Sequence, residues 1–336
     1  PIGDWNVSQV TTMNFLFKKA AAFDQPIGDW EVSSVTTIND MFYGASSFNH
    51  PIGDWNFTSL TSMSGTFNEA SSFNQPIGDW NVSQVTSMNF LFKQAAAFDQ
   101  PIGDWEVSSV TSMDEMFHGA SSFNHPIGDW DVSSVSDFDF FFKNASSFNQ
   151  PLGNWDVSSV TTMERTFDNA TAFNQPIGDW NVSSVQIMTY LFNHAINFNQ
   201  PIGNWNVSSV DTFQGVFGDA SSFNQPIGDW NTSSALKMAN MFNGATSFDQ
   251  PIGDWNLSSV TDINWMFLKT SNFNQDISRW DVSSVTGMQG TFRNTAAFDQ
   301  SLADWNVSSA TDMIGMFELA AGVSDANKGL IHAAFS

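Results

Sequence analysis

One chemical pattern returns every 25 residues along nearly the whole chain, and it limits the fold more than any other feature. Prolines stand at residue 1 and every 25th residue to 251, and tryptophans run likewise from residue 5 to 305. Thirteen units fill residues 1–325 without an insertion or deletion. Because an inserted residue would shift every stacked side chain, this spacing predicts a repeat solenoid. We call each unit a coil, number the coils 1 to 13, and count positions 1 to 25 from Pro1.

The pattern within a coil predicts its local structure. Apolar residues at positions 10, 13, 17 and 20, such as Val10 and Phe17, have the spacing of a short helix. Ser8 and Thr11 lie just before it and are of the type that caps helices. Proline at position 1 cannot donate to a ladder, so we expect only a short parallel strand near positions 25, 1 and 2. Each coil is therefore expected to contain one short strand and one short helix.

Three aromatic positions are expected to form the core. Tryptophan at position 5 and phenylalanine at positions 17 and 23 recur in nearly every coil, so equivalent rings such as Trp105 and Trp130 should lie over one another. Asparagine or aspartate at position 24 is expected to bond the backbone of the neighbouring coil. The core residues that we single out are Trp5, Phe17, Phe23, Trp105, Phe117, Phe167, Trp205 and Phe217.

Composition excludes several classes of function. The chain contains no cysteine, so disulfides, thiolate metal sites and cysteine nucleophiles are absent. Its formal net charge of −24 would repel phosphate backbones, which argues against nucleic acid as a partner. No stretch has the 18 or so consecutive apolar residues typical of a membrane span. Serine columns recur in nearly every coil, whereas a catalytic residue should be singular, so we expect no enzyme.

Position 15 varies widely, and such variation is typical of a surface. We expect position 15 to lie on a convex, helical face, where its aromatic residues could form sparse binding patches; the alternative is unselected surface variation with occasional packing. Lysine and arginine concentrate at the nearby positions 18 and 19. The aromatic residues at position 15 are Phe15, Phe90, Phe140, Tyr190 and Trp265.

Aspartate at position 4 forms an acidic column. Stacked carboxylates could share calcium ions, but asparagine and arginine interrupt the column, and an aspartate after glycine commonly bonds its own turn. We therefore expect no cofactor and keep calcium as the weaker alternative. The candidate calcium ligands are Asp4, Asp29, Asp54, Asp79 and Asp104.

The coil sequence from Trp155 to Gln175, WDVSSVTTMERTFDNATAFNQ, resembles two related groups of proteins. One is the BspA-like leucine-rich-repeat surface proteins, and the closer one is the 25-residue repeat domain of unknown function of mycoplasma lipoproteins. The resemblance covers residues 1–325. It implies a right-handed leucine-rich-repeat-like solenoid, an extracellular or cell-surface location, and adhesion or partner binding. It supplies no catalytic residues.

The end of the chain departs from the repeat. Residues 1–325 are expected to form one solenoid domain, and residues 326–336 to begin a C-terminal cap or linker in which Leu330, Ile331 and Phe335 cover the last coil. The chain is expected to be a piece of a longer surface protein.

Three functions remain open from the sequence. The leading one is a non-enzymatic extracellular scaffold for adhesion to a protein or glycan. The second is a structural module that assembles end to end into filaments. The third is ice binding through threonine rows such as Thr11, Thr36, Thr61 and Thr86, although these rows are broken at Gln186, Asp211 and Leu236.

Overall fold

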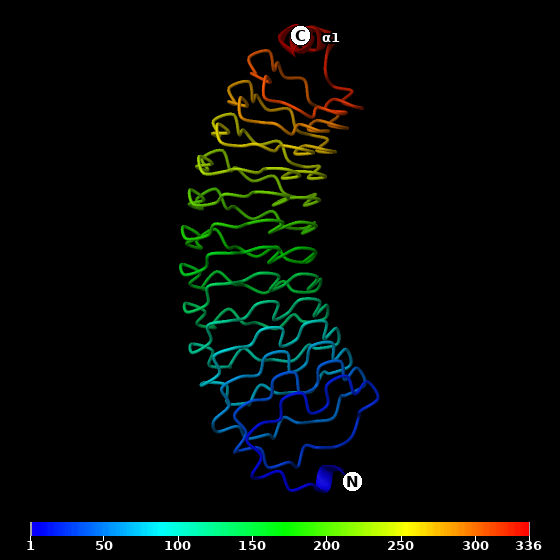
Figure 1. The fold of residues 1–336 in the computed structure, drawn as a ribbon, viewed down its shortest axis with the longest axis vertical. Helices are drawn as coiled ribbons and strands as arrows, with labels where there is room; N and C mark the ends of the chain where they lie inside the picture. Colours follow the sequence, from blue (N-terminus) through cyan, green and yellow to red (C-terminus); the bar gives the residue numbers. More distant parts are fainter. Residues whose placement is uncertain (1, 336) are drawn as a thin grey trace. The chain divides into compact units, whose positions relative to one another are not determined.

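A computed structural model describes residues 2–335, with the side chains of residues 2–331, as two compact units. Unit 1 comprises Pro1–Val160 with Asn169–Gln175, and unit 2 comprises Thr161–Asp168 with Pro176–Ser336. Within each unit the coils stack in sequence order (Figure 1). The repeat solenoid is confirmed, whereas the single domain expected over residues 1–325 stays a prediction.

Regular secondary structure is sparse among the described residues. The 3-10 helix η1 spans Ile2–Asp4 and the α-helix α1 spans Asp325–Phe335. Neither is long and apolar enough to cross a membrane. Isolated parallel bridges join neighbouring coils at position 12, for example Thr12 with Thr37. The strand expected near positions 25, 1 and 2 is therefore wrong, because the coils pair at position 12 instead.

The helix expected in each coil is also wrong, because its backbone donors are divided between two coils. The N–H groups of Asp40 and Phe42 donate to Ser64 and Thr66 of the next coil, at 2.8 and 2.9 Å. The N–H of Tyr43 instead donates to the carbonyl of Asp40 in its own coil, at 3.2 Å, and so forms a turn. An α-helix needs all these donors for its own carbonyls. The apolar spacing instead reflects consecutive turns, so Ser8 and Thr11 have no helix to cap.

Left-handed backbone at positions 15 and 19 of every coil shapes these turns. Phe15 and Lys19 have φ values of 63° and 59°, and the equivalent residues of the other coils lie in the same region. Position 15 is the third residue of the turn that starts at position 13, where positive φ is the mark of a type II turn. The two left-handed residues interrupt any helix that the apolar pattern could begin.

Stacked aromatic rings fill the interior of each unit, as predicted. The ring centroids of Trp105 and Trp130 are 6.4 Å apart with planes 5° from parallel, and those of Phe117 and Phe142 are 5.7 Å apart. Phe117, Phe167 and Phe217 are fully buried. Trp105, Trp205 and Phe17 are also buried.

Two of the expected core residues are less buried because they lie in coil 1. Trp5 is 59% exposed, and Phe23 is half-buried. The reason is visible at Trp30, whose indole N–H donates to the carbonyl of Ile2 in the preceding coil at 3.2 Å. Each tryptophan is thus covered and hydrogen-bonded by the coil before it, and the described residues contain no such coil for Trp5.

Glycine at position 3 allows neighbouring coils to approach closely. A Cβ added to Gly103 would lie 2.5 Å from the carbonyl oxygen of Pro126 in the next coil. Atoms of this kind do not approach so closely without a shift of the backbone, so the glycine is needed for stacking and not only for a turn.

Position 24 links neighbouring coils along one corner, as the sequence predicted. The Oδ1 of Asn49 accepts the backbone N–H of Asn74 at 2.9 Å, and the Gln75 side chain donates to the carbonyl of Asn49 at 2.8 Å. These bonds satisfy polar groups where the chain turns between coils.

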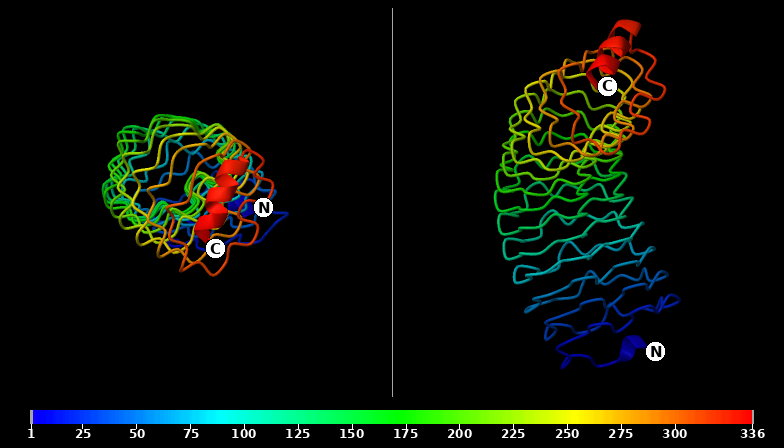
Figure 2. Two further views of the ribbon diagram at one scale, coloured as in Figure 1. Left: turned by 90° about the horizontal axis from the view of Figure 1, so that it is seen from above. Right: turned by 45° about the horizontal axis from the view of Figure 1, so that its top comes forward.

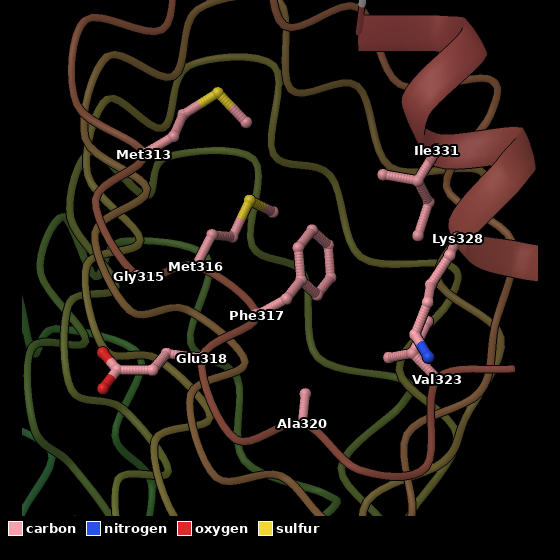
Figure 3. A pocket seen from close by; sticks show the side chains of 9 residues that line it. All are labelled: Met313, Gly315, Met316, Phe317, Glu318, Ala320, Val323, Lys328 and Ile331. Atoms are coloured by element: carbon pink, nitrogen blue, oxygen red, sulfur yellow. The ribbon is translucent and has the colours of Figure 1, made fainter. Parts of the chain in front are cut away.

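Helix α1 lies across the last coil of unit 2 (Figure 2). Ile331 faces the coil and is 7% exposed, whereas Leu330 is 49% exposed, contrary to the expectation that both cover the coil. The side chain of Phe335 lies outside the described residues. A cavity of about 570 Å³ remains between helix and coil, lined mainly by apolar residues such as Met316, Phe317 and Val323 (Figure 3). The cap is therefore loosely packed.

Candidate binding surface

The variable residues of each unit gather on one surface of the coils. Side chains at positions 11, 12, 14, 15, 18 and 19 are mostly exposed or half-buried, and we call this surface the outer face. It is made of bridges and turns instead of the helices expected there. Its backbone is nevertheless fixed, since the donors of positions 13, 15, 17 and 19 pair with the next coil in most coils.

The aromatic residues singled out at position 15 all have left-handed backbone. Their φ values run from 54° to 63°, a region that bulky residues seldom occupy. Glycine fills the same position in four coils, at Gly65, Gly215, Gly290 and Gly315, where this conformation has little cost. A bulky residue there costs roughly 1–2 kcal/mol more. An aromatic residue in this backbone therefore needs a gain that offsets the backbone cost, either from packing on the coil stack or from a partner.

Cations cover most of these rings. The Nζ of Lys93 lies 5.2 Å from the ring centroid of Phe90, and the Nζ of Lys143 lies 5.2 Å from that of Phe140. The guanidinium of Arg165 lies 4.4 Å from the ring of Tyr190. Cation–π contacts of this kind hold both partners in place at the surface. The four rings from Phe90 to Trp265 are half-buried, whereas Phe15 is 55% exposed although the Nζ of Lys18 lies 4.7 Å from its ring centroid.

Glycine at position 15 of the next coil makes room for two of the rings. A Cβ added to Gly290 would lie 2.7 Å from Cδ1 of Trp265, and the ring of Tyr190 covers Gly215 in the same way. Tyr190 also accepts a hydrogen bond on its hydroxyl from Nε2 of Gln214 at 3.0 Å. The rings at position 15 thus lean along the coil stack instead of standing free in solvent.

A charged cluster follows Phe90 in unit 1. The carboxylate of Glu115 lies 2.5 Å from the Nζ of Lys93 and 2.6 Å from the Nδ1 of His118. Burial opposes ionisation of Glu115, but the bonds from Lys93 and His118 outweigh it and lower its pKa. Burial likewise lowers the pKa of His118. The sequence did not indicate this cluster, because its members come from two coils.

Asp114 lies beside this cluster among other carboxylates. Burial, with the negative charges of Asp137, Glu115 and Asp139, raises the pKa of Asp114 to about 7. Its backbone N–H donates a hydrogen bond to the side-chain Oδ1 of Asn89 at 3.0 Å. Asp114 therefore changes charge near neutral pH, unlike an ordinary aspartate.

The acidic column at position 4 is exposed along its length. Asp4, Asp29, Asp54, Asp79 and Asp104 all have solvent-exposed side chains. No group of three or more His, Asp or Glu side chains in the described part of the chain is arranged to hold a metal ion. The turn-forming carboxylates and amides lie at position 6 instead, where Oδ1 of Asp131 accepts the N–H of Ser133 at 3.1 Å. The calcium alternative stays untested.

The threonine row at position 11 has a backbone role. The hydroxyl of Thr36 donates to the carbonyl of Thr11 at 3.0 Å, and that of Thr61 donates to Thr36 at 3.1 Å. These hydroxyl protons are engaged within the coil stack, which weakens the ice-binding interpretation.

The row is interrupted in coils 8 to 10, and a hollow lies at the interruption. Gln186, Asp211 and Leu236 replace threonine there. A hollow of about 330 Å³ opens over coils 8 to 10, and its lining residues are Thr189, Asp211, Thr212, Gln214, Leu236 and Lys237. In the sequence this interruption indicates only a defect in the threonine row. The loss of threonine at position 11 in three successive coils is nevertheless the sequence feature that marks the hollow.

Comparison with known proteins gives a clear family match and weak structural likenesses. The chain matches the family described as Mycoplasma protein of unknown function, DUF285, over residues 1–101, 61–177, 142–251 and 228–329. No curated protein matches the chain. A leucine-rich cell surface protein from Faecalibacterium prausnitzii is similar at 13% identity and a TM-score of 0.33, over 86% of each chain. A leucine-rich-repeat protein from Leptospira interrogans is 8% identical with a TM-score of 0.18, over 93% of this chain and 91% of that one. Likenesses of this size carry no argument about function.

Proposed function

Since the chain belongs to the DUF285 family of Mycoplasma proteins of unknown function, we propose that it is a non-enzymatic scaffold at the cell surface or outside the cell. It binds a protein or glycan partner through the outer face. The role calls for no cofactor, and the net charge of −24 argues against nucleic acid as the partner.

The observation that carries the proposal is the set of aromatic residues with left-handed backbone. Phe90, Phe140, Tyr190 and Trp265 occupy a position where glycine or asparagine has a lower backbone cost. Tryptophan, tyrosine and arginine are enriched at the energetic centre of protein interfaces, and this surface presents Trp265, Tyr190 and Arg165. A partner that contacts these rings would give a reason for the unfavourable backbone.

The test replaces the aromatic residues by asparagine, the residue that coil 10 has at this position as Asn240. Asparagine tolerates positive φ, so the four changes Phe90→Asn, Phe140→Asn, Tyr190→Asn and Trp265→Asn should leave the melting temperature unchanged or raise it. Arrays of purified extracellular proteins and of glycans are probed with the intact chain and with the variant. We expect partners of the intact chain to lose most of their signal with the variant.

A control variant changes charge at a position that is not part of the outer face. Asp54→Asn and Asp79→Asn remove two exposed carboxylates of position 4 without touching the outer face. Binding should survive these changes. The proposal is wrong if the intact chain binds nothing on either array, or if the asparagine variant binds as well as the intact chain.

End-to-end assembly is the second candidate function. The observation on its side is the exposed apolar side chains of Trp5 and Leu16 in the first coil, whereas helix α1 already lies across the last coil. Stacking of one copy on another would bury these side chains. Filaments that lengthen with protein concentration in electron micrographs would support this function, and a monomer at every concentration would exclude it.

A further inference from the structure

The hollow over coils 8 to 10 differs from the rest of the outer face in both sequence and shape. Elsewhere in the row, threonine hydroxyls cover the carbonyls of position 11, as Thr261 does for Leu236 at 3.2 Å. At Asp211 and Leu236 the residue is of another type, and the surface is indented by about 330 Å³. The indentation therefore coincides with a departure from the repeat.

The lining offers both donors and acceptors without net charge. Asp211 supplies a carboxylate and Lys237 an ammonium group, and within the described residues neither side chain has an ion-pair or hydrogen-bond partner. Thr189 and Thr212 add hydroxyls that both donate and accept. Most other cations of the chain are paired, as Lys93 is with Glu115. Groups left unpaired at the edge of a hollow are free to bond a ligand.

The hollow has one apolar lining residue and one polar side chain that is held in place by a hydrogen bond. Leu236 is half exposed and presents its methyl groups beside the polar residues. Gln214 is held by the Tyr190 hydroxyl through Nε2 at 3.0 Å, which leaves the amide oxygen as an acceptor. Tyr190 is one of the aromatic residues of position 15, so this part of the outer face lies beside one of the proposed binding rings.

These features together select one class of ligand. A phosphate or other anion would be attracted by Lys237 but repelled by Asp211. A cation would be attracted by Asp211 but repelled by Lys237. A neutral molecule with vicinal hydroxyls can accept from the ammonium group and donate to the carboxylate at once, while its C–H face packs against Leu236. The volume lies at the small end of the ~300–1,000 Å³ usual for ligand sites, which suits a single ring.

We propose that the hollow over coils 8 to 10 binds one neutral sugar residue, as the terminal unit of a glycan. Asp211 and Lys237 bond adjacent hydroxyls, Gln214 and Thr212 orient the ring, and Leu236 contacts its apolar face. This inference rests on the proposed function and assigns a ligand class to one part of the outer face.

The test uses the repeat itself to design a variant that folds. The triple variant Asp211→Thr, Leu236→Thr and Lys237→Thr restores threonine at the two positions where coil 2 has Thr36 and Thr37. Its melting temperature should equal or exceed that of the parent chain. A matched control, Lys269→Asn, removes another lysine of unit 2 at a position that is asparagine in coil 12, and it leaves the hollow intact.

Binding is measured by calorimetry and by saturation-transfer NMR with glucose, galactose and N-acetylglucosamine, and with inorganic phosphate and glycine as charged probes. We expect at least one of the three sugars to bind, its affinity to fall at least about tenfold in the triple variant, and the Lys269→Asn control to bind as the parent does. Absence of binding by all three sugars would overturn the proposal. Unchanged affinity in the triple variant, or equal binding of phosphate or glycine at the hollow, would overturn it too.

Failure here and failure of the proposed function give different results. If the asparagine variant at position 15 loses the array partners but none of the three sugars binds the parent chain, the scaffold function stands and the sugar site is wrong. If the asparagine variant at position 15 keeps all partners but the triple variant loses sugar, the sugar site stands alone.

Discussion

Asp114 occupies a position where the preceding coils have uncharged residues. Asn14, Asn39 and Asn89 each accept the backbone N–H of the next coil on their side-chain oxygen, at 2.7, 2.9 and 3.0 Å. Asp114 has the same shape but meets Asp137 and Asp139, and its pKa is raised to about 7. The ionised form is therefore disfavoured in the folded chain relative to the unfolded one.

The sign of the pH effect follows from that raised pKa. An acid that holds its proton more tightly when folded stabilises the fold at low pH, and this contribution is lost as the pH rises from about 4 to about 7. Asp114→Asn imitates the protonated form. We expect the melting temperature of this variant to exceed that of the parent at about pH 8, and the two to converge at about pH 4 and below, where Asp114 is protonated in the folded and the unfolded chain alike.

The control for this prediction is Asp104→Asn, which removes an exposed carboxylate of the same unit that lies outside the acidic group. It should change the melting temperature little at either pH. A gain from Asp114→Asn that is equal at both pH values would show that repulsion among the carboxylates is not its cause.

At the scale of the coil, the sequence predicted the buried positions better than the backbone conformation. The period of 25 gave the aromatic positions and their stacking, because a ring must repeat to form a continuous core. The helix was mistaken because apolar steps of three and four also arise from consecutive turns that share one buried side. The left-handed positions escaped notice because position 15 holds Phe15, Phe90 and Trp265 as well as glycine, so its side chains concealed the backbone requirement.

The interruptions of the repeat were harder to interpret than the repeat itself. Position 15 was chosen for its variation, and the structure places four of its five aromatic rings half-buried under cations or over glycines. The hollow could not be predicted from the sequence, because its lining residues come from coils 8, 9 and 10. In a sequence, the only sign of it was the loss of threonine at Asp211 and Leu236.

Removal of one ring tests how strongly each coil depends on its neighbours. Phe167 is fully buried, and its ring stacks on Phe192 at 5.6 Å and on Trp180 at 6.3 Å. Phe167→Ala should lower the free energy of unfolding by about 3–5 kcal/mol, since it leaves a cavity that the regular coils cannot close. Chemical denaturation measures this loss.

The exposed Phe15 provides the comparison for that change. Phe15→Asn introduces a residue that tolerates positive φ and removes a ring that is 55% exposed. The free energy of unfolding should therefore fall little or rise slightly. A loss from Phe167→Ala no larger than that from Phe15→Asn would contradict the stacked core.

At the scale of the whole chain, the acidic column makes a separate prediction about calcium. The carboxylates of position 4 are exposed, and the Asp254 carboxylate is paired with Arg279 at 2.9 Å. Exposed carboxylates in water have little reason to hold a cation that is not enclosed by further ligands. We expect the melting temperature to be the same in millimolar calcium and in EDTA. A rise of several degrees in calcium would revive the column as a metal site.

Array length is the remaining variable of the molecule. Residues 1–50 and 76–125 differ at only seven positions, which indicates a recent 75-residue duplication. Since each coil bonds mainly to its neighbours, in-frame deletion of residues 76–150 removes coils 4 to 6 without changing the register of the rest. The shortened chain should still unfold cooperatively, because position 3 glycine and the position 17 and 23 phenylalanines recur on both sides of the new junction.

Binding to a multivalent surface should nevertheless weaken, because the deletion removes Phe90 and Phe140 and shortens the span between the remaining contacts. The full-length variant Phe90→Asn with Phe140→Asn separates the two causes, since it loses the same rings and keeps the length. If length matters, the deletion should reduce avidity for an immobilised partner more than this variant does, while single-site affinity in solution is equal for both. A deletion that unfolds the chain, or that leaves avidity unchanged, would rule out array length as the selected property.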